Sequence, residues 1–146
     1  MSNALLTFSL RDAVRTAVIA AWGSIPISYG KPRMPIATTP YAVVQAGKVA
    51  ISFDGPAATV TNTSQENSFT IIGRFPFPTD PTQVIEDQKV TLANALIAQL
   101  QASGGFAGVG MAPLVGAVEW SEGDDPNEKV FEVTLQFRVM TQATHH

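Results

Sequence analysis

Side chains that could act as nucleophiles, bases or metal ligands are few in this sequence and stand in unfavourable places. The chain has no cysteine, and its two histidines are the last two residues, His145 and His146. Chain ends are usually poorly ordered, so we interpret this pair as a disordered end or the remnant of an affinity tag. Without cysteine or an internal histidine, Ser-His-Asp and Cys-His catalysis and the usual zinc-ligand sets are excluded.

Three further features suggest a ligand or a reaction but lack the required context. The glycine-rich run at 104–110 follows an expected helix and precedes an expected strand, whereas a phosphate-binding loop follows a strand and opens a helix. The acidic cluster at 124–128 lacks the spacing of a calcium loop. Glu119 and Glu132 could face each other across a hairpin, but a glycosidase carboxylate pair also needs a cleft. We therefore expect a protein that is not an enzyme, with no catalytic residue, metal site or cofactor.

The composition is that of one folded domain with a lightly charged surface. The 146 residues are 45% hydrophobic and 14% charged, against about 25% charged in typical soluble domains. One explanation is a surface partly covered by partner proteins, because interface cores are depleted in charge; the other is a surface rich in uncharged polar residues. The net charge of −3 and the scattered Lys and Arg residues give no nucleic-acid footprint.

No part of the sequence predicts a leader or a membrane span. The apolar residues near the N-terminus are interrupted by Arg11, Asp12 and Arg15, and no basic region precedes them. No stretch approaches the roughly 20 apolar residues that a span requires. We expect a soluble, unprocessed chain with no membrane partner, a single domain over 1–146, and a disordered or tag-derived segment at 142–146.

The elements that would position any site begin with a helix over 10–22. Its apolar residues recur at three- and four-residue spacing, which is the period of a helix with one buried face. Ser9 is expected at the N-cap with Asp12 three residues later, and Gly23 is a natural end.

A second helix is expected over 81–102. Asp80 would cap it and Pro81 would take its first position. Gln88 and Lys89 interrupt its apolar stripe, so we expect the N-terminal half of this helix to be the more exposed half.

Between and after the helices, alternating apolar and polar residues predict strands. The 23–40 segment is excluded from them, because its four prolines make a regular central strand unfavourable. The closing strand has the clearest alternation. Its odd-numbered residues from Phe131 to Val139 are expected on a buried face, and its even-numbered residues from Glu132 to Arg138 on a solvent-facing one. The expected strands are 41–46, 48–53, 68–75, 114–121 and 130–141.

Taken together, the layout resembles the tail terminator proteins, also called tail completion proteins, of long-tailed bacteriophages. The resemblance spans nearly the whole chain. It includes the helix beginning SLRDAVRTAV, the proline-rich stretch leading into PYAVVQ, the segment SFTIIGRFPFP, the helix DPTQVIEDQKVTLANALIAQLQ and the closing strand FEVTLQFRVMT. These segments carry no catalytic motif.

The resemblance implies an α+β fold with a mixed, largely antiparallel sheet packed against two main helices in the order α-β-β-β-α-β-β. It also implies a homo-oligomer of six copies closed into a ring. Such a ring caps the tail-tube protein, ends tube polymerisation and joins the tail to the head connector or neck protein. The expected location is the virion, after assembly in the host cytoplasm, and no nucleic-acid sequence is recognised.

A closed ring needs a head-to-tail interface, and several residues are candidates for it. The loops at 24–40 and 55–68 are expected to face partners, and the exposed side of strand 130–141 could abut a neighbouring copy. The candidate interface residues are Lys31, Arg33, Met34, Lys48, Arg74, Glu132 and Arg138.

Two other readings fit the same elements. A head–tail connector or the tail-tube subunit itself would share the small α+β build, but a tube subunit would polymerise into long tubes instead of stopping at a ring. A ferredoxin-like domain that binds a small molecule would need no ring and would expose an apolar pocket with a few polar groups.

Overall fold

The computed structural model describes residues 7–30, 40–54, 62–77, 84–101, 113–122 and 130–144. Two helices and five strands follow one another in the order expected from the sequence, which confirms the α+β class and the order α-β-β-β-α-β-β. The elements are α1 (Thr7–Trp22), β1 (Ile27–Tyr29), β2 (Tyr41–Asp54), β3 (Asn62–Pro76), α2 (Ile85–Gln101), β4 (Leu114–Glu122) and β5 (Val130–Thr144).

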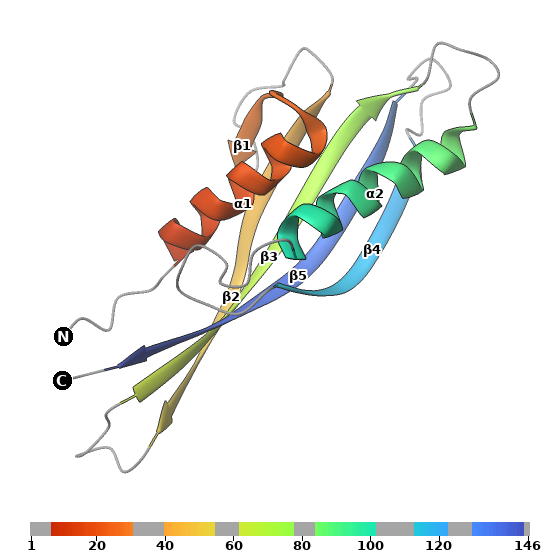
Figure 1. Cartoon of the computed structure of the whole chain (residues 1–146). Helices are drawn as coiled ribbons and strands as arrows, with labels where there is room; N and C mark the ends of the chain where they lie inside the picture. The colour runs from red at the N-terminus through yellow and green to blue at the C-terminus, as the bar shows by residue number, and fades with distance from the viewer. Residues whose placement is uncertain are drawn as a thin grey trace.

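The five strands form one sheet in the order β1-β2-β3-β5-β4. The short β1 runs parallel to β2, and every other neighbouring pair is antiparallel, so the sheet is mixed and largely antiparallel. Both helices lie on the same face of the sheet (Figure 1), with α1 against β2 and α2 against β5 and β4. The opposite face, which we call the open face, carries neither of these helices.

The individual strands differ from the expected set in two places. The strands predicted at 41–46 and 48–53 are one continuous strand, β2, with a bulge between Ala46 and Val49. A bulge keeps a strand in its sheet while one or more residues go unpaired. The proline-rich stretch contains β1, which sequence patterns did not predict; it is tolerated because it is three residues long and lies at the sheet edge.

Helix α1 begins earlier than predicted and ends where predicted. It starts at Thr7, so Ser9 lies inside the helix and is not its N-cap, which corrects the sequence expectation. Gly23 follows with φ of 89° and donates its N–H to the Ile19 carbonyl at 2.9 Å. Glycine takes this left-handed conformation without the steric cost of a Cβ, which is why helices commonly end on it.

Helix α2 begins at Ile85, later than the predicted start at 81. The predicted cap at Asp80 and Pro81 lies outside the described residues. The Val84 carbonyl accepts hydrogen bonds from the N–H groups of Asp87 and Gln88, at 3.1 and 3.2 Å, and so forms the first turn.

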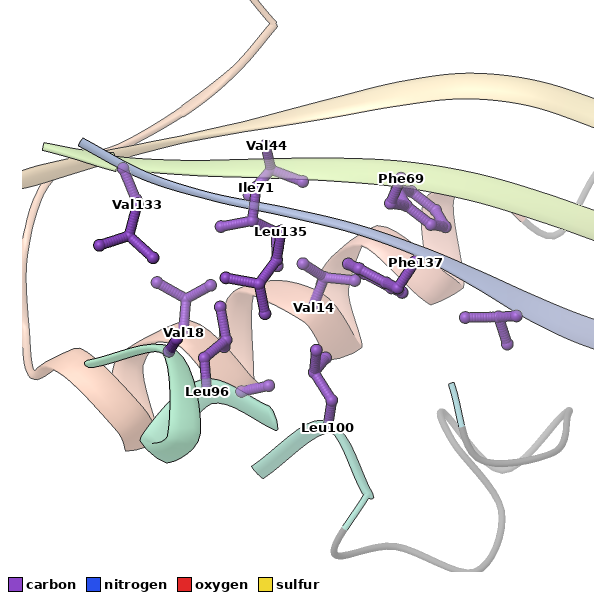
Figure 2. Close-up of a cluster of buried hydrophobic side chains, with 14 of the residues drawn as sticks. Val14, Val18, Val44, Phe69, Ile71, Leu96, Leu100, Val133, Leu135 and Phe137 are labelled. Atoms are coloured by element: carbon purple, nitrogen blue, oxygen red, sulfur yellow. The ribbon is translucent and has the colours of Figure 1, made fainter. Parts of the chain in front are cut away.

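The hydrophobic core lies between the two helices and the covered face of the sheet (Figure 2). The Phe69 and Phe137 rings stack at 5.6 Å between centroids on neighbouring strands. Each large apolar side chain removed from water contributes about 1.5–3 kcal/mol. The labelled core residues of Figure 2 are Val14 and Val18 from α1, Leu96 and Leu100 from α2, and Val44, Phe69, Ile71, Val133, Leu135 and Phe137 from the sheet.

Trp22 fastens α1 to both α2 and the sheet. Its indole Nε1 donates a hydrogen bond to the Leu92 carbonyl at 3.0 Å, and its ring meets the Phe75 ring edge to face at 5.0 Å. The ring lies so close to Gly73 that a Cβ built there would be 2.6 Å from Trp22 Cζ3. Glycine at position 73 therefore creates the space that the indole fills.

Two strands are longer than the sequence suggested. β5 continues to Thr144, into the 142–146 segment that was expected to be disordered. β3 begins at Asn62, so the second half of the loop predicted at 55–68 is strand. The two extensions pair with each other, beginning with Asn62 opposite Thr144. Sequence patterns did not predict them, because the apolar and polar residues do not alternate in these polar segments.

Candidate interaction surface

Three strands continue past both helices and form a projecting ribbon (Figure 1). We call this part of the sheet the arm and define it as 49–54 of β2, 62–67 of β3 and 139–144 of β5. β3 lies in its middle, paired with β2 on one side and with β5 on the other. The arm is thus a three-stranded extension whose backbone is held by hydrogen bonds between its own strands.

The two edge strands of the sheet cover only part of their neighbours. β1 pairs with Ala42 to Val44 of β2, and its ladder ends where Gly30 N–H meets the Val44 carbonyl at 2.8 Å. Within the described residues, β2 therefore has a strand on one side only from Gln45 to Asp54. β4 is the last strand on the opposite side of the sheet, so its outer edge has no strand partner in the part of the chain that is described.

The open face of the sheet carries charges that neutralise one another. Arg74 and Glu132, directly opposite each other on β3 and β5, form an ion pair at 3.1 Å. Arg138 and Glu66 form a second pair at 2.9 Å on the same two strands. Three of these residues were predicted as interface residues, and each has an intrachain partner. A shallow depression on this face is lined by Ser68, Thr70, Gly116, Ala117, Gln136 and Arg138, together with Phe69 and Phe137.

The remaining predicted residues fall into two groups. Lys31, Arg33 and Met34 lie outside the described residues, as do the glycine-rich run, the acidic cluster and both histidines. Lys48 is described: it is exposed and lies on β2 at the bulge, beyond the last residue paired with β1.

The carboxylate pair considered from the sequence is not formed. Glu119 lies opposite Thr134, and Glu132 lies opposite Ser121. The two glutamates are therefore offset along the strands, and Glu132 is occupied by Arg74. No group of three or more metal-ligating side chains occurs among the described residues, and no described helix is long and apolar enough to cross a membrane.

The N-terminal half of α2 is the more exposed half, as expected, because Ala93, Leu96 and Leu100 are buried in the C-terminal half; Lys89 is the buried exception in the N-terminal half. Its side chain is 8% exposed, and its Nζ is 2.9 Å from Glu86 Oε1 and 3.1 Å from Glu122 Oε1. The hydrogen bond that Lys89 donates to Glu86 raises the pKa of Lys89 above its ordinary value; desolvation of the ammonium group opposes this shift, and Glu122 adds to it. Trp120 Nε1 also donates to the Lys89 carbonyl at 3.3 Å, so this network joins α2 to the edge strand β4.

Several large apolar side chains are exposed on the arm and on β4, and sequence reasoning did not single them out. Ile51 and Met140 lie on the arm at 44% and 40% exposure, and Leu114 and Trp120 lie on β4 at 52% and 43%. The signal that could have found them is the register of the strands, which requires the neighbouring strand to be known. These residues, with the free edges, make the arm and β4 the candidate interaction surface.

The domain belongs to the class of two-helix α+β domains with one mixed five-stranded sheet, and its fold recurs in phage-like particles. A chain in the virion of a native gene transfer agent particle is similar, with a TM-score of 0.56 and 17% sequence identity over 97% of this chain and 100% of that one. A chain in the sheath/tube terminator of an extracellular contractile injection system, in its extended state, is also similar. There the TM-score is 0.54 and the identity 12% over 99% of this chain, which spans 58% of the terminator chain.

At these identities the likeness establishes a shared fold. No protein-family model matches the sequence, and comparison with curated proteins finds no match. The chain therefore has the fold of components of virions and tail-like particles, and both similar chains come from structural assemblies of many proteins.

Proposed function

We propose that this protein is a tail terminator that closes into a ring of six copies at the end of a phage-type tail tube. In this role it stops tube polymerisation and presents a docking face to the head connector or neck protein. The protein is then a non-enzymatic part of the virion, assembled in the host cytoplasm, and its partners are its own copies, the tail-tube protein and the connector.

The observation that carries this proposal is the similarity in fold to a sheath/tube terminator over 99% of the chain. The described residues agree with it in two respects. Arg74 with Glu132 and Arg138 with Glu66 form ion pairs on the sheet surface, and no metal-ligating group occurs among the described residues. Within the described part of the chain, the sheet also has edges without a strand partner and exposed apolar residues on two opposite sides, as a head-to-tail assembly requires.

The test is the mass and shape of the purified protein over a concentration series. Light scattering coupled to size exclusion, with negative-stain imaging of the same fractions, should give a discrete species near six times 15.5 kDa with a ring outline. Open-ended polymers would instead identify a tail-tube subunit. A strict monomer at every concentration, together with saturable binding of a small molecule, would favour the ligand-binding domain.

The function in the particle can be tested in a system that produces it. Deletion of the gene should give tails of uncontrolled length that fail to join heads, and supply of the protein in trans should restore joined particles. Joined particles with normal tails in the deletion strain would contradict the terminator role.

A further inference from the structure

Among the described residues, the sheet ends in two backbone edges that have no strand partner and are similar in length. One is the free edge of β2 from Gln45 to Asp54, beyond the reach of β1. The other is the outer edge of β4 from Leu114 to Glu122. A row of unpaired N–H and C=O groups is a template for another strand, and natural proteins usually shield such edges with lysine, proline or bulges. Each of these edges has a bulge.

The directions of the two strands also match. β2 is antiparallel to β3, β3 to β5, and β5 to β4, so β4 runs antiparallel to β2 within one chain. A second copy that lies beside the first in the same orientation therefore brings its β2 antiparallel to the first copy's β4. No copy has to turn over, and the contact is head-to-tail.

Charge complementarity fixes where the two edges meet. Lys48 on β2 and Glu119 on β4 are both exposed, and neither forms an ion pair with another described residue. Glu119 is on the open face, because it pairs with Thr134 there. Positions 47 and 48 form the bulge that lies opposite Ser68 on the open face, between the covered pairs Ala46–Phe69 and Val49–Asn67.

We propose that the free edge of β2 in one copy pairs antiparallel with β4 of the next copy, with Lys48 opposite Glu119. This proposal rests on the proposed ring and names the contact that builds it. The register also places Val49 opposite Val118 on the covered side and Ala50 opposite Ala117 on the open side, so directly opposed residues share a face over this stretch.

The geometry is compatible with a closed ring. Glu119 is level with Val43 of its own chain through the pairs Glu119–Thr134, Thr134–Ile72 and Ile72–Val43. Lys48 lies in the bulge opposite Ser68, four residues from Ile72 along β3. The proposed pairing therefore offsets neighbouring copies by about four residues, roughly 14 Å along the strands, across the four strands β2, β3, β5 and β4, roughly 19 Å wide. A ring closes on this offset when its strands tilt by about 35° from the ring axis, which is within the range of closed barrels.

Disulfide trapping tests the contact directly, because the chain contains no cysteine. Directly opposed residues on antiparallel strands have Cα atoms about 4.5–5.5 Å apart, which is within reach of a disulfide. The double variant Lys48→Cys with Glu119→Cys is oxidised and run on a non-reducing gel. We expect a ladder of linked copies that ends at the closed ring. Each single-cysteine variant, as the matched control, should give dimers at most.

The possible outcomes separate this contact from the proposed function. A wild-type ring without a ladder in the double variant overturns the edge pairing and leaves the terminator role standing. A ladder without an upper limit, together with long tubes, supports the pairing and overturns the terminator role. If the double variant links no more copies than the single variants do, the edge pairing is overturned, whether or not the wild-type protein forms a ring.

Charge reversal gives a second, independent test. Lys48→Glu and Glu119→Lys should each raise the protein concentration needed for half assembly by about tenfold, because each places like charges opposite each other. The double reversal should restore assembly. Equal weakening in all three variants, or none, contradicts the assigned register.

Discussion

The covered face of the sheet changes character along β3 and β5, between the part beneath the helices and the arm. Beneath the helices, the inward positions hold residues such as Phe69, Ile71 and Leu135, all buried. On the arm the same row continues with Asn67 and Gln65, which are 1% and 2% exposed. One half of the sheet is therefore built from side chains that drive folding, and the other half from side chains that must be hydrogen-bonded when buried.

This difference separates stability from assembly. The helix-covered half supplies the hydrophobic free energy that holds the domain together. The arm adds backbone pairing and buries Val139 at its base, and it keeps Ile51 and Met140 on the surface. Substitutions in the first half should unfold the protein, while substitutions on the arm should leave the fold intact and weaken contacts between copies.

The largest expected effect comes from the core. Phe137→Ala removes one of the two stacked rings and should lower the free energy of unfolding by about 3–5 kcal/mol, because a cavity adds to the lost burial. Met140→Ala, three residues further along β5 and exposed, should change it by less than about 0.5 kcal/mol. Urea denaturation of both variants makes the comparison. Similar losses would show that the arm contributes to stability as the core does.

The next effect tests the space that Trp22 fills. Gly73→Ala should lower the free energy of unfolding by about 1–3 kcal/mol, because the new methyl group would overlap the indole ring and Phe75. Gly116→Ala is the matched control, since its Cβ would have only the Gln136 carbonyl nearby, at 3.9 Å. Thermal melting should separate the two variants, and equal melting temperatures would contradict the packing of Trp22 on Gly73.

The Lys89 network should appear in the pH dependence of stability. The folded pKa of Lys89 is raised above 10.5, mainly by Glu86, so its stabilisation is complete below pH 10.5 and is lost as the pH rises through the folded value. Lys89→Met removes this titration and should cost on the order of 1 kcal/mol at neutral pH. The difference between wild type and variant should shrink above pH 10.5. A constant difference from pH 8 to 11.5 would rule out the raised pKa.

The smallest effects are expected from the ion pairs on the open face of the sheet. Arg138→Ala breaks its pair with Glu66, where the two side chains are 54% and 34% exposed, and should cost at most about 1 kcal/mol, less at high salt. Arg74→Ala should cost somewhat more, because the Arg74 side chain is only 24% exposed. Urea midpoints of both variants at low and high salt test this order of stability losses. A larger loss of stability in Arg138→Ala than in Arg74→Ala would contradict it.

Local patterns in the sequence were sufficient for the two helices, for most of the strands and for the core. The three- and four-residue spacing before Gly23 predicted α1, and the alternation from Phe131 to Val139 predicted which face of β5 is buried. The absence of cysteine and of an internal histidine removed whole classes of chemistry. These inferences succeed because the periods of helices and strands are properties of neighbouring residues.

Only the tertiary structure decided the pairing of distant segments. It joined two predicted strands into β2, paired β1 within the proline-rich stretch, and carried β3 and β5 into the polar arm. It also buried Lys89 between Glu86 and Glu122 and, among the described residues, left the outer edges of β2 and β4 without a strand partner. The physical reason is that burial, ion pairing and edge exposure depend on which strand lies alongside, and no spacing within one segment specifies its neighbour.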